Sequence, residues 1–130
     1  MNTALICIAL LGALVIGLGF YVTICRGITN TITGGNDEPD NILNKAMRAH
    51  GNTIEFAPML ALLIYVLGNM NPDTWVVWCM MLVTASRYLI VAGLILPQTM
   101  ARPNPMRFVG ALGTYLCGAA LCVALLMKVL

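Results

Sequence analysis

Charged side chains are scarce in this sequence, where aspartate, glutamate, lysine and arginine make up only 9% of the 130 residues. A soluble domain carries about 25% of these residues. The chain therefore lacks the polar groups needed to cover a surface in water, and 60% of its residues are hydrophobic. This composition excludes a soluble globular protein and predicts a single membrane-embedded domain over residues 1–130.

Basic stretches and metal ligands are also few. The formal net charge is only +2, and no segment alternates basic with aromatic side chains, so no nucleic-acid partner is expected. The chain has one histidine, and its five cysteines form no C-x-x-C pair. We therefore expect no metal site, and most of the cysteines are interpreted as small apolar side chains within helices.

Long apolar runs account for most of the sequence. A helix of about 20 residues crosses the hydrocarbon core of a bilayer, and four runs reach that length. Turn-forming glycine, asparagine and proline residues separate them. The expected fold class is an all-α integral membrane protein, a four-transmembrane-helix bundle. Its helices are predicted at about residues 3–25, 41–69, 73–96 and 106–130.

Lysine and arginine are distributed unevenly between the two ends of this predicted bundle. At the end that holds the termini and the second loop, Lys128 is the only basic residue, whereas the end with the first and third loops holds five. Cytoplasmic loops carry the excess of basic residues, so the first and third loops should be cytoplasmic and both termini should lie on the opposite side. The basic residues at the first and third loops are Arg26, Lys45, Arg48, Arg102 and Arg107.

Two ionisable side chains interrupt the apolar runs. Arg87 lies near the middle of the third run, where an arginine costs about 2.5–3.5 kcal/mol even on insertion scales. Glu55 is the only carboxylate within an apolar segment, which makes it the expected counter-ion. One interpretation of these two residues is a purely structural Glu55–Arg87 ion pair.

The second run begins with the octet Arg48-Ala-His-Gly-Asn-Thr-Ile-Glu55. At about 100° per residue, Arg48, Asn52 and Glu55 fall on one face of a helix. Arginine pairs with carboxylates, while a glutamate accepts hydrogen bonds from an ammonium. This face therefore suits a small ligand with carboxylates and an ammonium. His50 points about 200° away from Arg48, toward a neighbouring helix or subunit.

Several motifs match the pattern of one known family. They are the octet followed by Pro58, the preceding Glu38-Pro39-Asp40, the third-helix Arg87 and the segment from Arg102 to Gly110. In these residues the chain resembles the MAPEG family, the membrane-associated proteins of eicosanoid and glutathione metabolism, and particularly its bacterial members. The resemblance implies a MAPEG-like four-helix domain that forms homotrimers, in a bacterial inner membrane.

The resemblance also implies glutathione as co-substrate, bound between subunits near the cytoplasmic side. Arg107 matches the arginine that stabilises the glutathione thiolate and is the implied catalytic residue. A cation beside the sulfur favours the thiolate, which is the nucleophile. Arg26 would reach in from a neighbouring subunit, and His50 would lie at that interface. The positions implied to bind glutathione are Arg26, Arg48, His50, Asn52, Glu55 and Arg87.

The implied function is a membrane-bound, glutathione-dependent transferase or peroxidase acting on lipophilic electrophiles that arrive from the bilayer. Two departures leave an alternative open. Leu94 stands where glutathione-using members have a tyrosine, and Ile90 stands where they have an aromatic residue or a histidine. The alternative is a non-catalytic subunit of the same fold that binds a protein partner. A small multidrug exporter fits less well, because such exporters place their essential membrane carboxylate in the first helix and residues 3–25 contain none.

Overall fold

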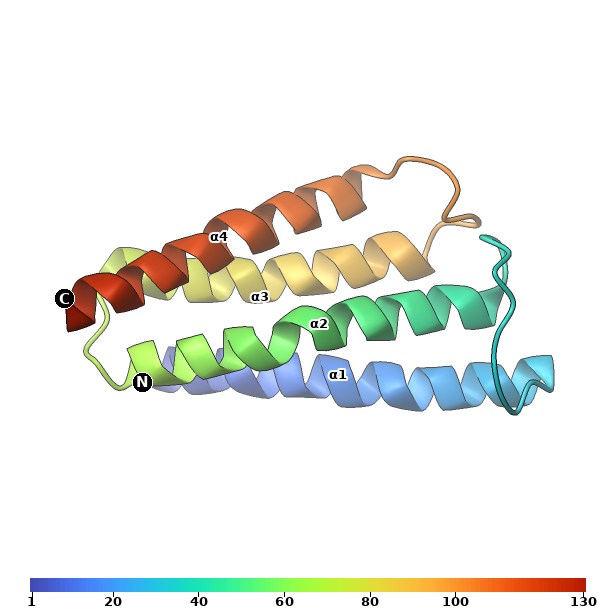
Figure 1. Ribbon diagram of the computed structural model, residues 1–130, viewed down its shortest axis with the longest axis horizontal. Helices are drawn as coiled ribbons and strands as arrows, with labels where there is room; N and C mark the ends of the chain where they lie inside the picture. The colour runs from blue at the N-terminus through green and yellow to red at the C-terminus, as the bar shows by residue number, and fades with distance from the viewer.

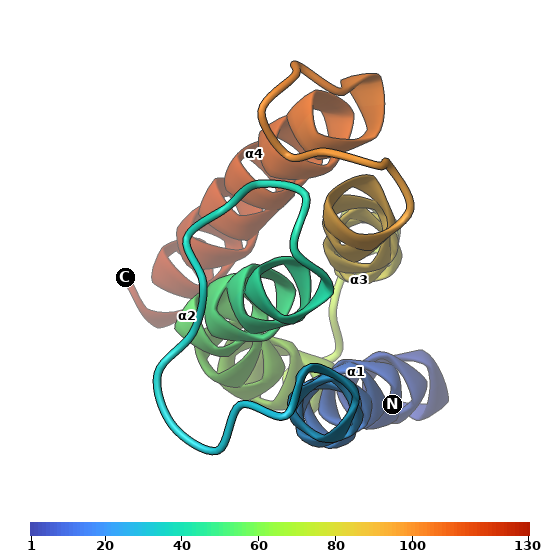
Figure 2. The same ribbon diagram turned by 90° about the vertical axis from the view of Figure 1, so that its right-hand side faces the viewer.

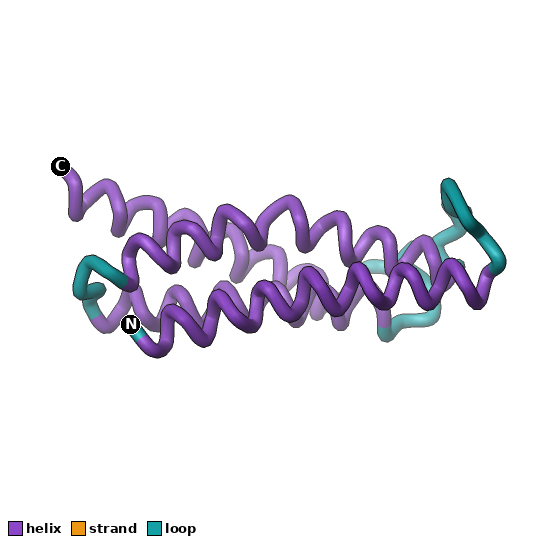
Figure 3. Tube along the Cα trace, turned by 90° about the horizontal axis from the view of Figure 1, so that it is seen from below, coloured by secondary structure: helices purple, strands orange, loops and turns teal.

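The computed structural model of the protein describes residues 1–130 and contains four α-helices and no strands. Each helix is long and apolar enough to cross a membrane. The helices run up and down in chain order and lie side by side (Figure 1), and only short segments of the trace are not helical (Figure 3). The prediction of an all-α integral membrane protein with four transmembrane helices is confirmed. The helices are α1 (Asn2–Thr29), α2 (Ile42–Gly68), α3 (Thr74–Ile95) and α4 (Pro105–Val129).

The first helix is longer than its apolar run. α1 continues past Cys25, where the predicted helix ended, to Thr29. Asn30 then adopts a left-handed conformation with φ of 51°, and its N–H donates to the carbonyl oxygens of Arg26 and Gly27. A left-handed residue of this kind is a common way to end a helix. Backbone hydrogen bonding, not hydropathy, therefore fixes the end of α1.

Two asparagines begin the helices that follow the polar loops. Asn41 Oδ1 accepts hydrogen bonds from the backbone N–H groups of Leu43 and Asn44, at 2.9 and 3.1 Å. Asn104 Oδ1 accepts from the backbone N–H of Met106 at 2.8 Å, with Pro105 at the first helical position. Both arrangements satisfy N–H groups that have no partner in the helix. They fix where α2 and α4 start.

The loops at residues 30–41 and 96–104 lie together at one end of the bundle, which we call the loop end (Figures 1 and 2). The two termini and the turn at residues 69–73 lie at the other end (Figure 1). The backbone N–H of Met100 donates to the carbonyl oxygen of Pro39 at 3.0 Å. Lys45 Nζ also donates to the carbonyl oxygen of Pro97 at 3.0 Å. These bonds join the two loops and the start of α2.

The largest apolar core occupies the half of the bundle near the termini. It includes Leu11 of α1, Ile64 of α2, Met80 of α3 and Leu121 of α4, each at most 1% exposed. α4 lies beside α2 near its own C-terminus and moves away from α2 toward the loop end (Figures 1 and 2). The loop end therefore contains only smaller apolar clusters.

Glycines allow α3 and α4 to approach closely. A Cβ atom at Gly93 would lie 2.8 Å from the backbone nitrogen of Arg107, and one at Gly110 would lie 2.6 Å from Ile90 Cγ1. Contacts this short cannot be accommodated without moving one of the helices. Small residues promote such packing between helices in lipid. The α3–α4 contact is therefore set by glycine, and it places the start of α4 against the end of α3.

Candidate functional site

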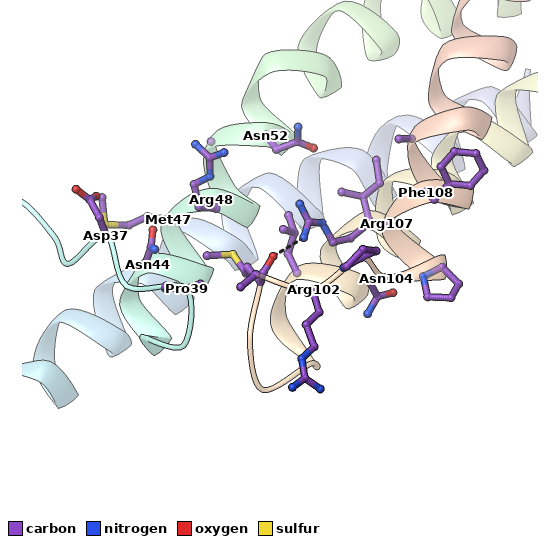
Figure 4. Close-up of a pocket in the computed structure, with 18 of the residues that line it drawn as sticks. Asp37, Pro39, Asn44, Met47, Arg48, Asn52, Arg102, Asn104, Arg107 and Phe108 are labelled. Atoms are coloured by element: carbon purple, nitrogen blue, oxygen red, sulfur yellow. Dashed lines mark hydrogen bonds between the residues drawn. The ribbon is translucent and has the colours of Figure 1, made fainter.

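An open cavity of about 1260 Å³ lies at the loop end and is lined by α2, the end of α3, the start of α4 and both polar loops (Figure 4). It is the place where charged side chains from these segments meet. Three arginines against two carboxylates leave the lining with a net charge of +1. The charged lining residues are Asp37, Arg48, Glu55, Arg102 and Arg107.

The polar stripe predicted on the second helix lines this cavity. Arg48, Asn52 and Glu55 are all part of its wall, as their spacing on one helix face requires. Arg48 and Glu55 are exposed within the chain. Neither forms an ion pair, because the only ion pair in the structure joins Lys128 to Asp73 at the other end of the bundle. Both charged groups are therefore available to a ligand or to a second chain.

Arg107 brings a cation to the cavity from α4. Its Nη1 donates to the carbonyl oxygen of Met100 at 2.9 Å (Figure 4). The missing side chain at Gly93 leaves room for its backbone against α3. Arg102 also belongs to the lining, but its side chain extends away from the other labelled side chains (Figure 4). Of these two arginines, Arg107 is the one held in place by a hydrogen bond.

The expected ion pair between Glu55 and Arg87 is absent, and that prediction is wrong. Arg87 is 1% exposed and donates from Nη2 to Asn52 Oδ1 at 2.6 Å and to the Asn52 carbonyl oxygen at 2.9 Å. Its guanidinium carbon lies 4.9 Å from the centre of the Phe56 ring. An amide and an aromatic face thus replace the carboxylate, since Glu55 is directed to the exposed side of α2. Arg87 lies behind the cavity wall.

Arg26 and His50 lie outside the cavity of their own chain. Arg26 Nη1 donates to the carbonyl oxygen of Gly34 at 2.9 Å and to other carbonyls of the first loop. His50 faces α1, where a Cβ atom at Gly19 would lie 3.4 Å from its Nε2. Of the expected site residues, the structure thus brings together Arg48, Asn52, Glu55 and Arg107. It does not bring Arg26, His50 or Arg87 into that cavity.

The wall that α3 and the following part of α4 contribute is apolar. Ile90 and Leu94 of α3 and Phe108 and Ala111 of α4 contribute to it. The positions at which the sequence departs from the glutathione-using pattern therefore face the same space as Arg107. No lining residue carries a hydroxyl or a thiol. Within one chain, only arginine and amide groups of this lining can therefore stabilise a thiolate.

Sequence reasoning missed several lining residues. Asn44 lies four residues before Arg48 on the same helix face, and this spacing would have identified it. Asp37, Met100 and Asn104 are brought in by loops, where no periodicity exists to reveal them. The structure contains no group of three or more histidine, cysteine, aspartate or glutamate side chains that could hold a metal ion.

Comparison with known families identifies the chain. The MAPEG family model matches residues 4–127, so the chain belongs to the MAPEG family. No curated protein and no solved structure matches it. The family includes glutathione transferases and peroxidases as well as non-catalytic members, is generally oligomeric and works with lipophilic substrates. The protein is accordingly an integral, multi-pass membrane protein of this family.

Proposed function

We propose that this protein is a membrane-bound, glutathione-dependent transferase or peroxidase that acts on lipophilic electrophiles. The observation that carries the proposal is the cavity that joins Arg48, Asn52 and Glu55 of α2 to Arg107 of α4. These side chains come from two helices and form no ion pair within the chain. They therefore surround one space at the loop end with unpaired charge.

The charges of the cavity complement those of glutathione. Glutathione carries two carboxylates and one ammonium, and the cavity offers arginines together with Glu55. Arginine binds carboxylate through paired, charge-assisted hydrogen bonds. Arg48 and Asn52 bind the peptide backbone in this proposal, and Glu55 accepts the ammonium. Glutathione is a co-substrate here, consumed in each turnover.

Arg107 stabilises the sulfur of the bound peptide as a thiolate. The thiol proton leaves to water, and the thiolate then attacks an electrophilic carbon, forming a C–S bond as the leaving group departs with its electron pair. The apolar wall formed by Ile90, Leu94 and Phe108 holds the lipophilic substrate beside the sulfur. With a lipid hydroperoxide, the same thiolate attacks the terminal oxygen, so that an S–O bond forms as the O–O bond breaks and the leaving alkoxide takes a proton from water to become an alcohol. The sulfenic acid of glutathione then condenses with a second glutathione, giving the disulfide and water.

We further infer a homotrimer with the loop end in the cytoplasm, in a bacterial inner membrane. Arg48 and Glu55 are exposed and without ion-pair partners on a membrane helix. Charges in such positions normally face a partner or a water-filled space. A neighbouring chain would cover this face and bring its own Arg26 and His50 to it. The excess of basic residues at the loop end supports the orientation.

One observation favours a second candidate function. The cavity wall around Arg107 has Leu94 and Ile90 but no hydroxyl. If catalysis requires a hydroxyl donor to the sulfur, the protein is a non-catalytic subunit that keeps the fold and binds a protein partner. In that case the charges at the loop end serve assembly.

The two candidates separate in an activity assay. The protein is reconstituted in lipid vesicles with glutathione and a chlorodinitrobenzene electrophile, and conjugate formation is followed by absorbance. The proposal predicts turnover above the rate without protein. Arg107→Ala should lower the turnover rate by at least about 100-fold, as for loss of one oxyanion donor, and Arg107→Lys should retain part of the wild-type rate. Lys128→Ala removes a cation at the other end of the bundle and should leave the rate unchanged. Absence of turnover in wild type with this electrophile and with a lipid hydroperoxide would favour the non-catalytic subunit.

A further inference from the structure

Asn52 connects the cavity to a buried arginine behind it. Its side chain lines the cavity, and it is also the only residue that accepts hydrogen bonds from Arg87. Arg87 is 1% exposed and is not part of the lining. Its Nε is the one buried side-chain nitrogen or oxygen in the protein without a hydrogen-bond partner. The guanidinium therefore depends on Asn52 for all of its hydrogen bonds.

This dependence fixes which end of the Asn52 amide faces the cavity. Arginine has five N–H donors and no acceptor, so the group that faces it must be an oxygen. Asn52 Oδ1 lies 2.6 Å from Arg87 Nη2. A half-turn of the amide would place Nδ2 against the guanidinium and remove the only side-chain acceptor of a buried cation, which is strongly unfavourable.

The nitrogen of the same amide remains free. Asn52 Nδ2 makes no hydrogen bond within the chain, and it is not among the buried atoms that lack a partner. Nδ2 is therefore not fully buried, and the residue that carries it is part of the cavity lining. An asparagine can usually present either a donor or an acceptor to a ligand. Here only the donor is offered.

We propose that Arg87 is a positioning residue that holds the Asn52 amide with its oxygen inward and its nitrogen toward the cavity, so that position 52 offers donors only to an anionic or carbonyl group. The proposal rests on the glutathione-dependent function above for the identity of the ligand. Asn52 then adds to the donors of Arg48 and Arg107. Acceptance of an ammonium is left to the carboxylates of Glu55 and Asp37.

Asn52→Asp separates positioning from a merely structural role. An aspartate keeps an oxygen toward Arg87, so the melting temperature without ligand should not fall. It also replaces the free N–H donors by an oxygen that repels carboxylates, so the affinity for glutathione should fall by about tenfold or more. Asn104→Asp is the matched control, because Asn104 lines the same cavity and aspartate is an equally good helix cap. It adds the same charge but should lose much less affinity.

Two substitutions of Arg87 test the same link from the other side. Lysine at position 87 can still donate to Asn52 Oδ1, whereas methionine cannot. Arg87→Lys should therefore retain more glutathione affinity than Arg87→Met, measured by the ligand-induced rise in melting temperature. An equal loss in both variants, at equal stability, would contradict positioning through a hydrogen bond.

A ligand-free measurement keeps this inference distinct from the proposed function. In protein labelled with ¹⁵N-asparagine, the side-chain signal of Asn52 is assigned by its loss in Asn52→Asp. Exchange of its N–H protons with water supports the orientation, and protection from exchange overturns it. Equal losses of glutathione affinity in Asn52→Asp and Asn104→Asp would also overturn it. An exchanging signal in a wild type that glutathione does not stabilise supports positioning by Arg87 and contradicts the glutathione function.

Discussion

Arg87 donates a hydrogen bond to the side-chain oxygen of Asn52 at 2.6 Å, where the carboxylate of Glu55 was the expected partner. The buried cation is thus paired with an amide, a backbone carbonyl and the face of Phe56. The amide links the interior of the bundle to the cavity wall. Asn52 consequently contributes both to stability and, in our proposal, to ligand binding, and substitutions can separate the two contributions.

Asn52→Ala should destabilise the folded protein by about 1.5–3 kcal/mol, the range for a hydrogen bond to a charged group. The substitution leaves Arg87 with the backbone oxygen as its only acceptor. Denaturant unfolding in detergent measures the change. The control is Asn44→Ala, whose amide donates to the Glu38 carbonyl oxygen at an exposed site. Equal effects of the two substitutions would contradict a special role for the buried bond.

Glu55→Ala should change the stability of the ligand-free protein by no more than about 0.5 kcal/mol, as for an ordinary surface substitution. Glu55 is exposed and makes no ion pair, so its removal leaves no cation unpaired in the chain. Glutathione binding should nevertheless weaken, because the acceptor for the ammonium is lost. Thermal unfolding with and without glutathione measures both effects. A loss of about 3 kcal/mol or more without ligand, typical of a broken buried ion pair, would mean that Glu55 has a charged partner after all.

Gly93→Ala should push α4 away from α3 and lower both stability and activity. A Cβ atom there would lie 2.8 Å from the backbone nitrogen and from Cγ of Arg107. Overpacking of this kind costs about 1–3 kcal/mol. Gly12→Ala is the control, since a Cβ atom on that exposed face of α1 meets nothing within 4 Å. Unchanged melting and turnover in Gly93→Ala would show that the α3–α4 contact is looser than the structure indicates.

Leu94→Tyr should increase turnover by about tenfold or more, because one well-placed donor to a developing charge is worth about 10²–10³ in kcat. Leu94 lines the cavity that contains Arg107, so a tyrosine at this position would introduce the hydroxyl that the wall lacks. Leu94→Phe provides a ring of similar size without the hydroxyl. Steady-state conjugation kinetics compare the two. Identical rates in both variants would indicate that a hydroxyl at position 94 does not reach the sulfur.

The sequence was sufficient to predict the fold because apolar length and polar turns determine which segments cross the bilayer. It also placed Arg48, Asn52 and Glu55 on one face, since helical periodicity is a local property. The prediction of the partner of Arg87 was wrong, because tertiary geometry determines which side chain reaches the arginine. Glu55 is the only carboxylate within an apolar run, which made it the expected partner of Arg87. The orientation of α2 instead brings the amide of Asn52 to the arginine.

The cavity shows the same limit. Asp37 and Asn104 lie in two loops that are far apart in the sequence and are joined by the backbone hydrogen bond from Met100 to Pro39. No sequence spacing predicts that contact. Arg26 is held outside the cavity by hydrogen bonds to the first loop, and His50 packs against α1. A role for either at the site requires a second chain, which a single sequence cannot place.

The most direct test of the central claim is the melting temperature of the detergent-purified protein with and without millimolar glutathione, in wild type, Arg48→Ala and Lys128→Ala. A ligand at about 100 times its dissociation constant adds about 2.7 kcal/mol to the folded state. We predict a clear rise in melting temperature for wild type and Lys128→Ala and none for Arg48→Ala. No rise in any of the three, or the same rise in all, would contradict a glutathione site in the cavity at the loop end.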